Sequence, residues 1–139
     1  MIANWPGTIK AGQIVGDLVD FSDFLPTFID LAGAQLTSDR TIDGTSFADG
    51  LRGQGASPRT WAYSESAVLP KPGGVEPDGE HSGLRWVRNA RWKLYSDDRL
   101  YDMQLDDGER AAIPKAADTP GQSTARSTLI RALKSLSVQ

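Results

Sequence analysis

The residue types that catalyse group transfer are scarce in this chain, and they are not spaced as a catalytic set. Its 139 residues include a single histidine, His81, and no cysteine. A serine nucleophile needs a base beside it, and the sequence has no Gly-x-Ser-x-Gly turn to expose a serine for attack. Without cysteine there are no disulfides, zinc–thiolate sites or cysteine nucleophiles, and one histidine cannot make a multi-histidine metal site. We therefore predict that these residues contain no catalytic residue and no metal ligand.

Two pairs of neighbouring acids, Asp97-Asp98 and Asp106-Asp107, are the remaining candidates for acid–base chemistry. Such chemistry requires two carboxyl groups whose surroundings separate their pKa values. Adjacent acids more often form solvated turns, and neither pair continues into the alternating acids of a calcium-binding loop. We favour the interpretation that both pairs stabilise turns.

Basic and aromatic residues gather between positions 85 and 93, and they allow two interpretations. One is an anion site with aromatic platforms, suited to sulfate, phosphate or an acidic sugar. The other is a β-hairpin with a charged outer face and an aromatic inner face, which strand alternation alone predicts and which we favour. The residues concerned are Arg85, Trp86, Arg88, Arg91, Trp92 and Lys93.

His81 is the one residue that we single out as a candidate substrate contact. It lies in residues 70–83, a stretch rich in Pro, Gly and acids that is typical of a long surface loop. Loops of that length often carry function, and histidine can donate or accept hydrogen bonds near neutral pH. The alternative is an ordinary loop histidine.

The N-terminal part is expected to contain a short strand from Ile2 to Trp5, ended by the turn Trp5-Pro6-Gly7. A helix should follow, with Ser22 or Asp23 as its N-cap and Gly33 just beyond its end. Apolar residues cover much of its circumference, so it needs contacts on more than one side. They are Phe21, Phe24, Leu25, Phe28, Ile29, Leu31 and Ala32.

The second half is expected to form a small antiparallel sheet of three to four strands with a C-terminal helix packed on it. Aromatic and β-branched residues predict strands at residues 60–65, 84–88, 92–95 and 99–103. The final helix should begin near Ser123 or Thr124, with an apolar stripe formed by Leu129, Ile130, Leu133 and Leu136. The expected fold class is α+β, with domains at residues 1–55 and 56–139.

Composition limits the classes of partner. Fifteen basic and 18 acidic residues give a net charge of −3, which argues against nucleic acid as the main partner. No apolar run is long enough to cross a membrane, and no charged segment followed by an apolar one suggests a secretory signal. The sequence leaves the compartment open between periplasm and cytoplasm.

Several segments, in this order, resemble the C-terminal part of the sulfatase family, within the alkaline-phosphatase-like superfamily. No single segment is specific, and the order and spacing carry the resemblance from Ile2 to about Glu109. The segments are Ile2-Ala3-Asn4-Trp5-Pro6-Gly7, Val19-Asp20-Phe21-Ser22-Asp23-Phe24-Leu25-Pro26-Thr27, Ile42-Asp43-Gly44-Thr45-Ser46-Phe47, Arg85-Trp86-Val87-Arg88-Asn89-Ala90-Arg91-Trp92-Lys93-Leu94-Tyr95 and Leu100-Tyr101-Asp102-Met103.

The resemblance implies that the catalytic groups and this subdomain belong to different parts of a sulfatase. Sulfatases hydrolyse sulfate esters with a formylglycine, made from a Cys/Ser-x-Pro-Ser-Arg motif, and with calcium held by Asp and Asn side chains. None of those positions matches this chain, and Ser57-Pro58-Arg59 is only a superficial echo of the motif. The resemblance therefore implies a strand–turn–helix remnant of the catalytic α/β domain at residues 1–55, followed by the C-terminal subdomain. Calcium and formylglycine would belong to a missing N-terminal part.

The function that we expect is that of a subdomain of a sulfatase-like hydrolase, inactive by itself. It would complete the fold and line part of the substrate pocket, with His81 facing the substrate. Its partners would be the missing catalytic core, or a second copy bound through exposed apolar surface, and a sulfated small molecule or sugar. The alternative is a stand-alone, non-catalytic binding module derived from such a subdomain.

Overall fold

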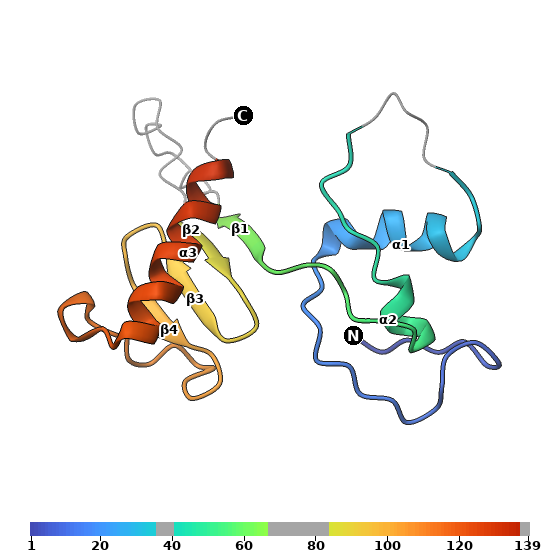
Figure 1. Ribbon diagram of the computed structural model, residues 1–139, viewed down its shortest axis with the longest axis horizontal. Helices are drawn as coiled ribbons and strands as arrows, with labels where there is room; N and C mark the ends of the chain where they lie inside the picture. Colours follow the sequence, from blue (N-terminus) through green and yellow to red (C-terminus); the bar gives the residue numbers. More distant parts are fainter. Residues whose placement is uncertain (36–40, 67–83, 137–139) are drawn as a thin grey trace, which may run out of the picture. The chain divides into compact units, whose positions relative to one another are not determined.

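The computed structural model describes residues 1–35, 41–66 and 84–136, and His81 lies outside these residues. The chain divides into two compact units, Met1–Ala62 and Tyr63–Gln139. The division falls between residues 62 and 63, whereas the sequence suggested a boundary between residues 55 and 56. Figure 1 gives the order of the elements. None of the described helices is long and apolar enough to cross a membrane.

The first residues form a turn and no strand. The amides of Thr8 and Ile9 donate to the Trp5 carbonyl at 3.0 and 2.9 Å, which confirms the turn predicted at Trp5-Pro6-Gly7. The strand predicted from Ile2 to Trp5 is wrong, because the structure assigns these residues to no strand, and Ile2 is 97% exposed. An extended segment becomes a strand only when another strand satisfies its backbone groups, and no described strand pairs with this one.

The predicted first helix is confirmed, but it begins differently. A 3₁₀ turn, η1 (Phe21–Asp23), leads directly into α1 (Phe24–Leu31). Asp23 is the N-cap residue of α1, one of the two predicted, but its side chain makes no capping bond to α1. Instead, the Asp20 and Asp23 side chains cap η1 reciprocally, since they accept from the Ser22 and Asp20 amides at 3.0 and 2.8 Å. Gly33 lies just beyond the end of the helix at φ +64°, a left-handed conformation that glycine adopts without strain.

A short helix, α2 (Ala48–Arg52), packs near α1 and ends at Gly53. The segment that leads to it passes very close to η1. A Cβ atom on Gly44 would lie 2.0 Å from the Ser22 carbonyl oxygen, so only glycine fits at that position.

The second unit contains an antiparallel sheet, in agreement with the predicted α+β class. Its strands are β1 (Ala62–Ser66), β2 (Leu84–Arg88), β3 (Trp92–Tyr95) and β4 (Leu100–Asp102), and they neighbour one another in sequence order. Val87 pairs with Leu94 across β2 and β3, and Leu94 pairs with Leu100 across β3 and β4. These three residues therefore form an apolar row on one face of the sheet.

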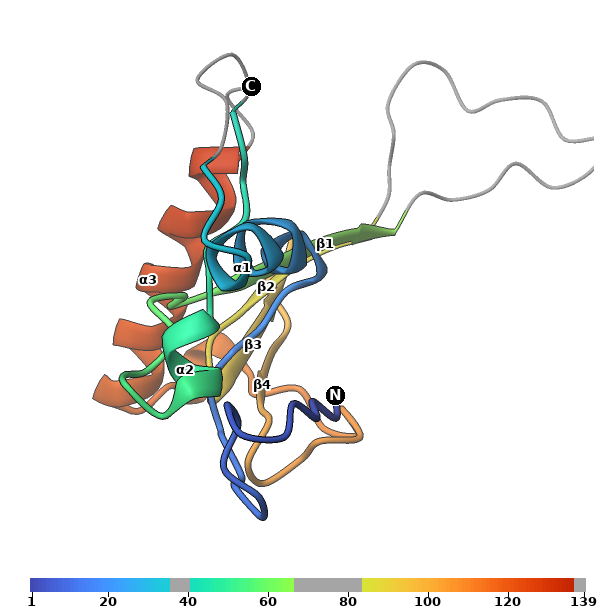
Figure 2. The ribbon, with the colours of Figure 1, turned by 90° about the vertical axis from the view of Figure 1, so that its right-hand side faces the viewer.

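Helix α3 (Pro120–Leu136) covers that face (Figures 1 and 2). It buries Val87, Leu94, Leu100 and Leu129 to an exposed fraction of 1% or less, which makes them the core of the unit. The helix begins at Pro120, earlier than the predicted Ser123 or Thr124. Thr119 and Gln122 explain the difference, because each side chain bonds the backbone amide of the other, at 3.4 and 2.7 Å, as a reciprocal N-terminal cap.

A buried arginine fastens two loops to α3. Arg126, 2% exposed, donates to both carboxylate oxygens of Asp118 at 2.8 and 3.0 Å and to the carbonyls of Asp98 and Ile113 at 2.6 and 3.2 Å. The hydrogen bonds to Asp118 raise the pKa of Arg126 above its ordinary value. Because every donor has an acceptor, this buried charge stabilises one arrangement of the loops.

Candidate functional site

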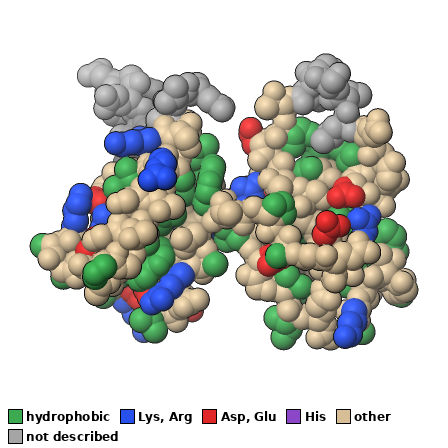
Figure 3. Space-filling model, in the orientation of Figure 1, with side chains coloured by type: hydrophobic (Ala, Val, Ile, Leu, Met, Phe, Trp, Pro, Cys, Tyr) green, Lys and Arg blue, Asp and Glu red, His purple; other side chains and the backbone are tan. Residues whose placement is uncertain are grey.

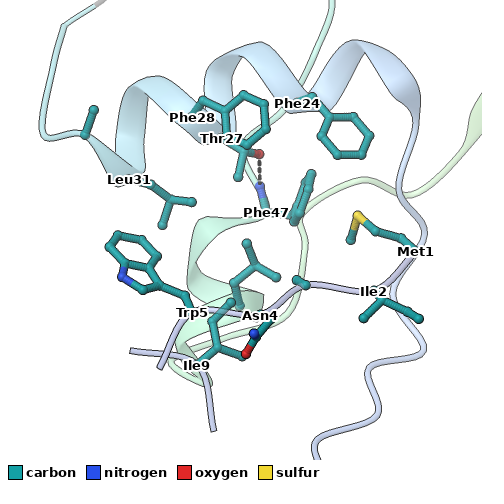
Figure 4. A pocket seen from close by; sticks show the side chains of 13 residues that line it. Met1, Ile2, Asn4, Trp5, Ile9, Phe24, Thr27, Phe28, Leu31 and Phe47 are labelled. Atoms are coloured by element: carbon teal, nitrogen blue, oxygen red, sulfur yellow. Dashed lines mark hydrogen bonds between the residues drawn. The ribbon is translucent and has the colours of Figure 1, made fainter. Parts of the chain in front are cut away.

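The N-terminal unit contains an apolar groove of about 510 Å³. Its first wall is the N-terminal segment, with Met1, Ile2 and Trp5, and its second is α1, with Phe28 and Leu31 (Figure 4). Asn4 and Thr27 are its only polar side chains among the residues that line it, which are otherwise aliphatic, aromatic or Met. The groove therefore offers apolar surface and lacks groups for acid–base chemistry.

One threonine fixes the inner part of the groove. Thr27 is fully buried, and its Oγ1 donates to the Asp23 carbonyl at 2.6 Å and accepts from the Phe47 amide at 3.0 Å. The bond between the Phe47 amide and Thr27 Oγ1, drawn as a dashed line in Figure 4, joins α1 to the segment that enters α2. The Phe47 ring then meets the Phe24 ring edge to face, with centroids 5.6 Å apart. Thr27 thereby sets the position of the aromatic residues around the groove.

A buried carboxylate, that of Asp23, lies at the N-terminal end of the same helix. It accepts from Arg59 Nε at 2.6 Å, from the Thr45 amide at 2.7 Å and from the Asp20 amide at 2.8 Å, and it forms an ion pair with the Arg59 guanidinium. Burial would raise the pKa of Asp23, but the bonds from Arg59, Thr45 and Asp20 outweigh it and lower the pKa below its ordinary value. Asp23 is therefore a charged anchor and is not poised to exchange protons near neutral pH.

Large apolar side chains are exposed both in the walls of the groove and outside it. In the walls, Ile2 and Phe28 have exposed fractions of 97% and 61%, and outside the groove Ile14 and Phe21 have exposed fractions of 96% and 88%. Figure 3 shows such hydrophobic side chains at the surface of the unit that holds α1. The N-terminal unit thus leaves several large apolar side chains exposed to water.

The basic residues of the predicted hairpin are not assembled into one anion site. Arg91 donates to Asp102 Oδ2 at 3.0 and 2.8 Å, and Lys93 Nζ lies 2.5 Å from Glu109 Oε1. The Asp102 hydrogen bond raises the pKa of Arg91, and the Arg91 bond lowers that of Asp102. Two of the cations are thus paired within the chain, which favours the hairpin interpretation. Its aromatic inner face is wrong, because the buried face carries Val87 and Leu94, while Trp86 pairs with Tyr95 on the opposite face beside Lys93.

The paired acids serve turns and ion pairs where the structure gives them contacts. Asp106 accepts from the amides of Arg110 and Ala111 at 3.0 and 2.9 Å, and Asp97 bonds Arg99 Nε at 2.8 Å. Nowhere in residues 1–35, 41–66 and 84–136 do three His, Cys, Asp or Glu side chains gather closely enough to hold a metal ion. The described residues therefore do not fit a calcium centre.

Sequence reasoning missed the roles of Asp23, Thr27 and Arg59. Asp23 looked like a helix cap, and Arg59 belonged to an apparent echo of a catalytic motif. Asp23 and Arg59 contact each other across 36 positions, and Thr27 bonds the Phe47 amide across 20 positions, so local sequence patterns contain neither contact. The candidate contact His81 lies outside the described residues, and its role stays a prediction.

Comparison with known proteins identifies relatives for most of the chain. It is 32% identical over 115 residues to N-acetylglucosamine-6-O-sulfatase of Bacteroides thetaiotaomicron, a match covering 78% of this chain and 20% of that protein. It is 37% identical over 94 residues to arylsulfatase A of Bos taurus, covering 68% of this chain and 16% of that one. The chain thus spans at most about a fifth of the length of these curated relatives. No family model matches it.

Solved structures give the same result. A 2-O GAG sulfatase superposes with a TM-score of 0.57 and 30% identity, covering 82% of this chain and 23% of that one. A second structure, in complex with its substrate D-glucosamine-2-N,6-O-disulfate, superposes with a TM-score of 0.55 and 31% identity, covering 81% and 23% of the two chains. The predicted resemblance to the sulfatase family is confirmed.

Proposed function

Because the chain is related to the sulfatase family over about a fifth of its relatives' length, we propose that it is the supporting subdomain of a sulfatase-like sulfuric ester hydrolase. It completes the fold of the catalytic domain and forms part of the wall of the substrate pocket. The formylglycine nucleophile, the calcium ion and its ligands lie outside these 139 residues. One observation carries the proposal: the apolar groove and the exposed apolar side chains of the N-terminal unit.

The physical argument concerns the free energy of this surface. Removing a Phe, Leu or Ile side chain from water stabilises a protein by about 1.5–3 kcal/mol. Phe21, Leu25 and Phe28, all more than half exposed, do not receive that stabilisation within the N-terminal unit. A partner that covers them would gain it. The surface is therefore built for a large apolar counterpart.

The counterpart that we propose is the catalytic domain of a sulfatase-like chain. Most of the length of the relatives has no equivalent in these residues. The fold of the matched part is retained, with TM-scores of 0.57 and 0.55. The substrate that we propose is a sulfated sugar or a related small sulfate ester, with His81 contacting it.

The first test is an assay of the 139-residue chain with an aryl sulfate and a sulfated glucosamine in the presence of calcium. We expect no turnover above a heat-treated control, because the nucleophile and the metal ligands are supplied elsewhere. Hydrolysis that scales with chain concentration would overturn the proposal.

The second test is complementation. The sulfatase of Bacteroides thetaiotaomicron is expressed without its matching segment, and this chain is supplied as a separate polypeptide. We expect co-purification and partial recovery of sulfatase activity, with Phe28→Ser abolishing both and Lys10→Ser, a change at an exposed polar position, leaving both intact. Failure of the wild-type chain to co-purify would count against docking through this surface.

The second candidate function is a stand-alone binding module, and the self-contained core of the C-terminal unit favours it. A chain of this kind would remain monomeric in light scattering and would bind sulfated sugars by itself. Association into larger species without sugar binding would leave the subdomain proposal as the better account.

A further inference from the structure

The face of the sheet opposite α3 carries a lysine enclosed by two aromatic rings and a carboxylate. Trp86 and Tyr95 are partners across β2 and β3, and Lys93 lies two residues from Tyr95 on the same face. Lys93 Nζ lies 4.4 Å from the centroid of the Trp86 ring and 4.8 Å from that of Tyr95. The Glu109 carboxylate lies 2.5 Å from the same nitrogen.

These groups have the chemistry that recognises organic ammonium ions. The faces of Trp and Tyr rings attract a cation, and such aromatic enclosures are used to bind ammonium ligands. A carboxylate adds a charge-assisted hydrogen bond. The side chains of Lys93 and Glu109 are only 12% and 24% exposed, which reduces screening by water and strengthens both attractions.

The carboxylate is held in place by the loop that carries it and by a neighbouring ring. The Tyr95 hydroxyl donates a hydrogen bond to Glu109, and the backbone of Glu109 adopts φ +54°. Directly after it, the amides of Arg110 and Ala111 donate to Asp106. The position of Glu109 is therefore fixed by more than its bond to Lys93.

We propose that Trp86, Tyr95 and Glu109 form a binding cage for a primary alkylammonium group, which this chain fills with its own Lys93. The filled cage holds the loop that carries Glu109 against the face of the sheet opposite α3. Without the lysine amine, the cage accepts a small alkylammonium ion from solution. This inference does not depend on the proposed sulfatase function.

The test uses the full chain with Lys93→Ala, which removes the atoms from Cγ to Nζ. Propylammonium replaces those atoms, and propanol is its neutral control. We expect propylammonium to shift the NMR signal of the Trp86 indole N–H saturably in the variant and not in the wild type. In the variant, propylammonium should bind about tenfold more tightly than propanol. Adding Glu109→Gln should weaken binding about tenfold. Equal shifts with propanol, or none in a folded variant, would overturn the proposal.

A second measurement uses the wild-type chain and holds even if the variant does not fold. A neutral amine attacks an acylating reagent through its lone pair, which an ammonium lacks, so a caged ammonium reacts slowly. We expect Lys93 to be acylated at least about tenfold more slowly than Lys115, whose side chain is 67% exposed. Comparable rates for the two lysines would show that the cage does not hold Lys93.

Discussion

The two units differ in the burial of their large apolar side chains. In the C-terminal unit, Val87, Leu94 and Leu129 are buried between sheet and helix. In the N-terminal unit, the fully buried side chains include Asp23 and Thr27, while Phe21 and Phe28 are 88% and 61% exposed. Of the large exposed hydrophobic residues in the described part of the chain, only Leu105 belongs to the C-terminal unit.

The difference indicates two ways of gaining stability. The C-terminal unit has a core of its own and uses ion pairs such as Arg126–Asp118 to fix its loops. The N-terminal unit has buried polar contacts such as those of Asp23 and Thr27, and several of its large apolar side chains are exposed. The C-terminal unit thus has the more complete apolar core of its own.

The largest effect is expected from removing the buried charge of the N-terminal unit. Asp23→Ala leaves the Arg59 guanidinium, whose side chain is 10% exposed, without its carboxylate partner. Breaking such a pair costs about 3–5 kcal/mol. Hydrogen exchange of the amides of α1 and α2 should accelerate accordingly, while those of the C-terminal sheet keep their rates. Unchanged exchange in α1 would show that polar contacts do not hold this unit together.

Lowering the pH should destabilise the protein by protonating the same carboxylate, Asp23. The folded-state pKa of Asp23 is lowered relative to the unfolded value of about 4. Its stabilisation is therefore fully present above that value and is lost as the pH falls through the lower folded-state pKa. In Asp23→Asn this loss should be absent, so the difference in stability between the two proteins should shrink as the pH falls below about 4.

A loss of about 2–5 kcal/mol is expected when the C-terminal core is opened by Leu129→Ala, because a cavity replaces the buried side chain. Guanidinium unfolding followed by tryptophan fluorescence measures it. The matched control is Leu105→Ala at a position that is 83% exposed, where the change should stay within about 0.5 kcal/mol. Similar losses in the two variants would contradict a self-sufficient core under α3.

A smaller effect is expected from Thr27→Val, which keeps the shape of the side chain and removes the hydroxyl. The Phe47 amide then loses its acceptor in a buried position, at a cost of about 1–3 kcal/mol. Amide exchange at Phe47 reports the change most directly. Thr8→Val, at an exposed position, serves as the control and should leave that exchange rate unaltered.

The smallest effect on stability is expected from Phe28→Ser, since the ring is already 61% exposed. The free energy of unfolding should change by no more than about 0.5 kcal/mol. Light scattering should instead show less self-association at equal concentration. A variant that loses stability while associating as before would mean that Phe28 belongs to the core of its unit.

The sequence predicted those elements whose residues carry local signals. The stripe of α1 and Gly33, the hairpin around Asn89 and the stripe of α3 follow from periodicity and turn chemistry. The Asn89 side chain, for example, accepts from the amides of Arg91 and Trp92 at 2.9 and 2.7 Å, as a turn-forming asparagine does. The earlier start of α3 also has a local signal, the Thr119–Gln122 cap, which lies outside the apolar stripe of the helix.

The remaining features depend on contacts between distant residues. Asp23 is a plausible N-cap by position, and only the approach of Arg59 and Thr45 makes it a buried anchor. Ile2 to Trp5 have the composition of a strand but no partner strand among the described residues. The groove combines residues from three separate segments, so its shape could not be predicted from any one of them.

Gly44 shows how differently two glycines can constrain the evolution of this chain. Gly33 has a left-handed backbone and open space around it, so asparagine, which tolerates that conformation, is an acceptable replacement. At Gly44 the obstacle is the neighbouring carbonyl of Ser22, which excludes every side chain whatever its backbone preference. Variation among natural descendants of this chain should therefore reach position 33 and spare position 44.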